Sequence, residues 1–161
     1  MSLAKRSRPK AVDRFWREIT ADPHRAHAHV SLLGLQTYET AQLHSRVREG
    51  LSYEAFERLR QVLDLPASRT AEILQIPPRT LARRREAKKF EPEESDRLIR
   101  LSRLIGLALQ LFEGDLEEMR PWLTAPHAAL ANQAPLEFAT TEIGAREVEN
   151  LIGRLEHGIP L

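Results

Sequence analysis

The chain contains no cysteine among its 161 residues. This absence excludes disulfides, thiol nucleophiles, iron–sulfur clusters and zinc sites with cysteine ligands. Long apolar runs are also missing, because the longest one, residues 104–112, is far shorter than the roughly 20 residues that a helix needs to cross a bilayer. The basic N-terminus is not followed by an apolar segment, so it does not resemble a secretory signal. We therefore expect a soluble, cytoplasmic protein without membrane contact.

Motifs that carry catalysis are missing as well. The sequence has no glycine-rich phosphate loop, no nucleophile elbow and no H-E-x-x-H pair. Its C-terminal glutamates are spread over the surfaces of expected helices, whereas acid–base pairs need environments that separate their pKa values. His24, His27 and His29 are too few for a closed zinc site, which needs about four well-placed ligands. We expect no catalytic residue, no metal and no cofactor, and an enzyme is the weakest of our hypotheses.

Charge is distributed unevenly, although the net charge of the chain is only +1. Residues 69–89 contain seven Lys or Arg and two Asp or Glu, whereas residues 113–161 contain three and nine. A short basic segment ahead of an acidic C-terminal part indicates two surfaces with different partners, unless both are simply solvated helix faces.

Hydrophobic periodicity predicts an all-α fold of about eight helices. The best strand candidate, residues 30–35, has no clear pairing partner. We expect a helical extension over residues 1–50, with residues 1–10 disordered, and a helix-turn-helix region over residues 51–90. A long central helix over residues 91–113 would connect this region to a small helical domain over residues 114–161.

The central helix is expected to begin at Pro92 and to be buried, because its second half is apolar on almost every side. Gly114 would end it, and Asp115 with Glu118 would form a capping box for the next helix. A last helix from about Gly144 places its inward-facing residues at helical spacing. These residues are Val148, Leu151, Ile152 and Leu155.

Residues 67–85 have the layout of a helix-turn-helix: a short helix, a turn and a second, basic helix. Ala71 is small where the two helices cross, and Leu74 and Ile76 flank the turn. Gln75 stands where glycine is common, since a positive φ is often needed there, and the proline pair that follows could set a different turn.

In this motif the start of the second helix meets base edges in the major groove of DNA. The side chains expected to point outward there are Pro78, Arg79, Thr80, Arg83 and Arg84. Arginine can bridge O6 and N7 of guanine. The residues better placed for phosphates are Arg85, Lys88 and Lys89. The alternative is a structural helix pair with solvated arginines.

Two stretches resemble a known family. Residues 79–114 resemble the linker and core helix of the Xre/MbcA/ParS antitoxin family, and residues 121–158 resemble its C-terminal toxin-binding domain. The second stretch is marked by Trp122-Leu123, Pro135-Leu136-Glu137, Gly144, Val148 and the run from Gly153 to Gly158. It departs from the family at Ala131 and Asn132, where glycines are common, and at Pro160 in the tail.

The resemblance implies a bacterial type II antitoxin whose partner is a RES-domain toxin that depletes NAD. The C-terminal domain would obstruct the toxin's active-site cleft, and the complex would repress its own operon through operator DNA. We expect a homodimer within a larger toxin–antitoxin complex. The expected toxin-binding residues are Trp122, Pro135, Leu136, Gly144, Val148, Leu151, Arg154, Glu156, His157, Gly158, Ile159 and Leu161.

A second hypothesis needs no toxin. The chain could be a stand-alone helix-turn-helix transcriptional regulator whose C-terminal half dimerises, because such readers usually bind paired half-sites.

Overall fold

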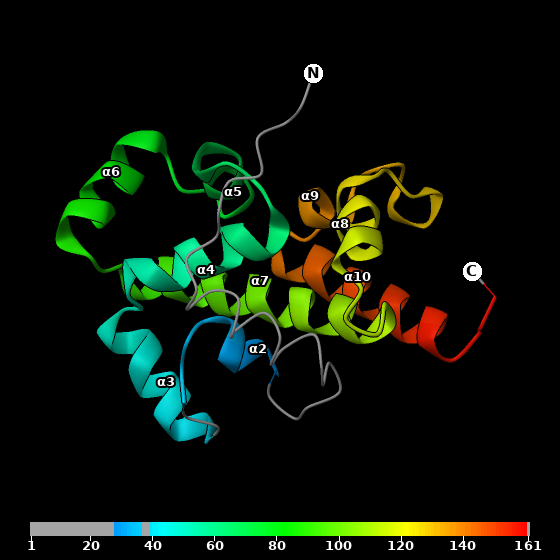
Figure 1. Ribbon diagram of the computed structural model, residues 1–161, viewed down its shortest axis with the longest axis horizontal. Coiled ribbons are helices and arrows are strands. Elements are labelled where there is room, and N and C mark those ends of the chain that lie inside the picture. Colours follow the sequence, from blue (N-terminus) through cyan, green and yellow to red (C-terminus); the bar gives the residue numbers. More distant parts are fainter. Residues whose placement is uncertain (1–27, 37–38, 161) are drawn as a thin grey trace.

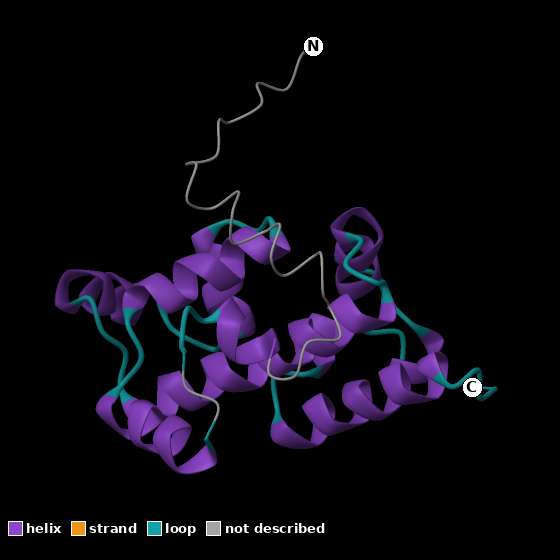
Figure 2. Ribbon diagram, turned by 60° about the horizontal axis from the view of Figure 1, so that its bottom comes forward, coloured by secondary structure: helices purple, strands orange, loops and turns teal. Residues whose placement is uncertain are grey.

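The computed structural model of the chain describes residues 28–36 and 39–160, and within them it is all-α (Figures 1 and 2). Residues 1–27 of the expected helical extension lie outside these residues, and they include residues 1–10 and two of the three clustered histidines. The elements are α2 (Ala28–Leu32), α3 (Thr40–Glu49), α4 (Tyr53–Leu63), α5 (Ala67–Ile73), α6 (Pro78–Ala87), α7 (Pro92–Leu111), α8 (Leu116–Thr124), the 3-10 helix η1 (Ala128–Leu130), α9 (Pro135–Phe138) and α10 (Glu142–Glu156). None of the described helices is both long and apolar enough to span a bilayer.

Helix α7 is the central element, as the sequence predicted. It contacts α2, α3, α4, α8 and α10, and Figure 1 shows it running through the middle of the molecule. Pro92 occupies its first turn, and Glu91 and Glu94 form a complete capping box there. Leu98, Ile105 and Leu109 are fully buried, since this helix supplies apolar surface to elements on several sides.

The N-terminal half of the described chain packs around an aromatic cluster. Tyr53 stacks on Phe90 with ring centroids 5.6 Å apart, and Phe56 contacts both rings. The backbone N–H of Leu51 donates to the buried Ser95 hydroxyl at 2.8 Å, which connects the start of α4 to α7. The stretch considered as a strand, residues 30–35, instead contains the end of α2 and the turn after it.

The C-terminal half consists of α8, η1, α9 and α10. Asp115 caps α8 by accepting from the backbone N–H groups of Glu117 and Glu118, at 2.9 and 3.2 Å. The reciprocal half of the expected capping box is not formed there; the complete box in the described chain is the one at α7. Ala131 and Asn132 adopt φ values of 54° and 59°, so they hold the left-handed conformation that glycine adopts most readily.

The two halves also contact each other directly. Arg120 of α8 donates to the carbonyl oxygen of Val62 at 2.9 Å, and Arg69 of α5 forms an ion pair with Glu137 of α9. Because α7 supplies core residues to both halves, we expect them to unfold together.

Replacing Leu104 by alanine tests this shared core. Leu104 is 1% exposed, so the substitution should lower the free energy of unfolding by about 2–5 kcal/mol in urea denaturation, in one transition. Leu107, three residues further along α7, is half-buried, and its replacement by alanine should cost only about 1 kcal/mol. Equal losses for the two variants would contradict the assignment of the buried face.

Candidate functional site

The turn between α5 and α6 has the backbone of a helix-turn-helix. Gln75 adopts a φ of 54°, so it takes the left-handed conformation expected of glycine at this position. The N–H of Ile76 closes the turn on the carbonyl of Ala71 at 2.8 Å. Pro77 and Pro78 do not set a different turn: they are the N-cap and first residue of α6. The positive φ that this position of the motif needs is therefore present at Gln75, and the alternative of a different turn is wrong.

Helix α6 presents a basic outer surface. The exposed residues at its start, along it and just after it include Pro78, Arg79, Arg83, Arg85, Lys88 and Lys89. Arg79 and Arg83, four residues apart, lie on one face of the helix. Arg83 also donates to the hydroxyl of the half-buried Thr80 at 3.4 Å, so that hydroxyl lies beside the same face. This arrangement brings most of the expected DNA-contacting residues together.

Arg84 does not belong to this surface. Its guanidinium donates to both carboxylate oxygens of Glu94, at 2.7 and 3.1 Å, and the two side chains are only 19% and 11% exposed. The hydrogen bond to Glu94 raises the pKa of Arg84. The expectation that Arg84 points outward to DNA is therefore wrong, because helical spacing places it on the inner side of α6 near Leu81.

A second residue of α7, Arg97, holds the turn. It donates to the carbonyl oxygen of Gln75 at 3.2 Å and to the carboxylate of Glu93 at 2.7 Å. Together with Glu94, it attaches both the turn and the second helix of the motif to α7. Sequence reasoning missed these positioning contacts, since they join residues that lie 10 and 22 positions apart.

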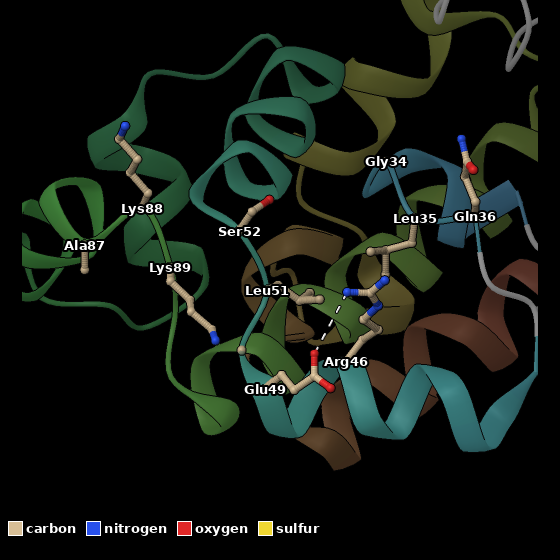
Figure 3. A pocket seen from close by; sticks show the side chains of 11 residues that line it. Gly34, Leu35, Gln36, Arg46, Glu49, Leu51, Ser52, Ala87, Lys88 and Lys89 are labelled. Atoms are coloured by element: carbon tan, nitrogen blue, oxygen red, sulfur yellow. Dashed lines mark ion pairs between the residues drawn. The ribbon is translucent and has the colours of Figure 1, made fainter.

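A broad open cavity of about 730 Å³ lies beside the end of α6 (Figure 3). Its charged lining residues are Arg46, Glu49, Lys88 and Lys89. Arg46 and Glu49 form an ion pair at 3.9 Å, which leaves the lysines as additional positive charge. The lining contains no histidine or tyrosine, and no group of three metal-ligating side chains occurs in the described residues. The cavity therefore extends the basic surface of α6.

The C-terminal half places several predicted toxin-binding residues in its own core. Five of the predicted residues are buried: Pro135, Leu136, Gly144, Val148 and Leu151. A side chain placed on Gly144 would meet the carbonyl oxygen of Phe138 at 1.8 Å, which shows how closely α9 approaches α10. These five residues build the core of the domain, so the free chain does not present them to a partner, and their contact with a toxin stays a prediction.

Trp122 is half-buried and packs within the domain. Its ring lies 5.9 Å from that of Phe112 and 5.0 Å from that of His127, whose Nε2 lies 2.9 Å from the Trp122 carbonyl oxygen. Trp122 therefore joins α8 to the end of α7 and to the loop after α8, with part of its ring still accessible.

The outer side of α10 and the tail remain available to a partner. Arg154 is partly exposed and pairs with Glu147 at 3.3 Å. The predicted residues exposed after it are Glu156, His157, Gly158 and Ile159, whereas Leu161 lies outside the described residues. Sequence reasoning missed Ile143, which is 84% exposed. The available signal was its position on α10, opposite to the inward-facing Val148.

Ion pairs fix the start of α10 on α7. Glu142 accepts from Arg146 at 3.1 Å and pairs with Arg100 at 2.8 Å. The hydrogen bond from Arg146, followed by the charges of Arg100 and Arg103, lowers the pKa of Glu142. Arg103 also donates to Glu149 at 2.7 Å. The first two turns of α10 are therefore held in one orientation.

Replacing Glu94 by alanine should lower the free energy of unfolding by about 3 kcal/mol. The substitution removes the main partner of the Arg84 guanidinium, which is largely shielded from solvent. Glu93 is a matched control, since its side chain is 83% exposed and its ion pair with Arg97 contributes about 1 kcal/mol or less. Urea denaturation of the two variants checks this. Similar losses would show that Arg84 and Glu94 are not a structural pair.

Comparison with known proteins divides the chain at the same helix. Residues 42–103 match the family described as the antitoxin Xre-like helix-turn-helix domain, and residues 107–158 match the antitoxin Xre/MbcA/ParS C-terminal toxin-binding domain. An "Antitoxin Xre" of Yersinia enterocolitica is 34% identical over 128 residues, which cover 79% of this chain and 86% of the relative. Proteins of the same name from Photorhabdus laumondii and Pseudomonas putida are 32% and 27% identical, over 79% and 74% of this chain and 86% and 74% of the relatives.

Proposed function

Since the chain belongs to the Xre family of antitoxins, the proteins that hold the toxin of a toxin–antitoxin system in check, we propose that it neutralises a RES-domain toxin by covering the toxin's active site. The family consists of binding and regulatory proteins, not enzymes, so inhibition needs no chemistry from this chain. The observation that carries the proposal is the exposure of the end of α10, inside the domain matched as toxin-binding, and of Ile159, which follows directly after the matched residues.

The tail suits an obstructing role. Gly158, at a φ of 62°, turns the chain away from α10, and Ile159 is 50% exposed instead of packed on the domain's own core. An apolar segment that projects from a rigid helix can enter a neighbouring cleft at little cost in conformational entropy. In this proposal the tail and the last turn of α10 occupy the opening of the toxin's NAD-binding cleft.

Charge favours the same partner. Residues 113–161 carry nine acidic and three basic side chains, and a cleft that binds the diphosphate of NAD is expected to be basic. Complementary charge would speed association and fix orientation, while apolar contacts supply most of the affinity.

The second part of the proposal is operator binding by α6. Arg79 and Arg83 would contact base edges in the major groove with Thr80 and Pro78 beside them, and Arg85, Lys88 and Lys89 would contact phosphates. A homodimer would read two half-sites, and the complex with toxin would repress its own operon. Contact by Arg84 is not part of this proposal.

The alternative is a transcriptional regulator whose C-terminal half dimerises. The exposed Ile143 would also suit self-association. Co-purification with the product of the adjacent gene separates the two functions, because only an antitoxin needs that partner.

Removing residues 158–161 tests the inhibitory role of the tail and keeps the last turn of α10, where Leu155 packs on the core. The truncated chain should lose most of its inhibition of NAD consumption by the purified RES-domain toxin, because the cleft is left open. Its operator binding should not change. Full inhibition by the truncated chain would rule out the tail as the obstructing element.

Arg79→Ala and Arg83→Ala should each weaken binding to the operator of this gene by about 1–3 kcal/mol, because each removes contacts to a base edge or phosphate. Arg146→Ala is the matched control, since its side chain is 73% exposed on the other half of the molecule. Binding can be measured by fluorescence anisotropy at several salt concentrations. Wild-type affinity of both variants would refute the assignment of α6 as the recognition helix.

A further inference from the structure

We propose that the toxin binds along the whole outer face of α10, with Ile143 as an anchor at the opposite end of the helix from the tail. This inference rests on the proposed function and adds to it a second contact region that the tail cannot supply. It concerns the face of α10 opposite to the buried Val148 and Leu151.

Ile143 is the first observation. It is 84% exposed, and the large hydrophobic side chains that are exposed in the described part of the chain are Ile143 and Ile159. Both lie at the ends of α10, one in its first turn and one just beyond its last. Because α10 belongs to the domain matched as toxin-binding, exposed apolar side chains at its two ends are suited to anchor a partner.

Ile143 is also held rigidly. The hydroxyl of Thr141 accepts from the N–H of Gly144 at 3.0 Å, which caps the helix directly at this point. Glu142 is paired with Arg100 at 2.8 Å, and Gly144 lies against the backbone of α9. Little conformational freedom is left to lose on binding, which is the property expected of an interface anchor.

The residues between the two ends form a continuous face. Spacings of 3, 4, 3 and 4 place five residues on one side of α10: Ile143, Arg146, Asn150, Gly153 and His157. At Gly153 no atom lies within 4 Å of the point where a side chain would begin, so a partner can approach the helix backbone there. With a rise of 1.5 Å per residue, the face is about 21 Å long.

The occupant is the toxin and not a second copy of this chain. The whole face lies inside the region matched as the toxin-binding domain, residues 107–158. Residues 113–161 as a whole carry nine acidic and three basic side chains, so two copies of this domain have net charge of the same sign, which disfavours their association. The partner surface that fits is an apolar socket for Ile143 on a surface of net positive charge.

The test uses Ile143→Asp and Ile143→Leu, with Ala129→Asp as a control. Ala129 is exposed on η1, which packs on the inner side of α10. Aspartate is favourable in the first turn of a helix, so Ile143→Asp should fold normally, and its melting temperature checks this. The probe is the product of the adjacent gene, which the proposed function expects to be a RES-domain protein, made catalytically inactive and titrated by calorimetry.

Ile143→Asp should weaken binding to this probe by about 10- to 100-fold, as for other buried interface anchors. Ile143→Leu and Ala129→Asp should bind like the wild type, and all variants should bind operator DNA equally. If the wild-type chain binds the probe and Ile143→Asp binds as tightly, the inference is wrong and the proposed function stands. If the wild-type chain does not bind the probe, both are wrong. A variant that changes only the oligomeric state of the free chain would make this face a self-interface and overturn the inference.

Discussion

The burial of α7 from several sides is the constraint on which the rest of the structure depends. A 20-residue helix that contacts α2, α4, α8 and α10 cannot shift without disturbing all of them. Its first two turns hold the helix-turn-helix through Glu94 and Arg97, and its middle holds α10 through Arg100 and Arg103. One helix therefore fixes α6 of the helix-turn-helix and α10 of the domain matched as toxin-binding relative to each other.

Arginine has two different roles in this chain, and burial separates them. Arg79 and Arg83 extend from α6 into solvent, where long-range attraction to an anionic partner is useful. Arg84 lies one position further along the chain, but its guanidinium is paired with a nearly buried carboxylate. Desolvation makes such a pair costly to break, so this arginine contributes to the position of α6 and not to its contacts.

Several of the residues that carry the family resemblance are not accessible to a partner. Leu136, Gly144 and Val148 mark the toxin-binding domain in the sequence, but all three are buried. These residues are needed for the packing of the domain, because the close contact between α9 and α10 tolerates few residue types. The accessible residues, Ile143 among them, belong to the opposite face of the helix, which packing leaves unconstrained.

Sequence alone determined the helices, their order and the helix-turn-helix layout, because prolines, glycines and apolar spacing act locally. Pro92 begins α7 and Gly114 follows its end for reasons that involve only nearby backbone. The tertiary structure decided which side chains are available. The pairing of Arg84 with Glu94 and the exposure of Ile143 both depend on how the helices pack against one another. Helical periodicity places residues on a common face, but only the neighbouring elements decide whether that face is buried or open to a partner.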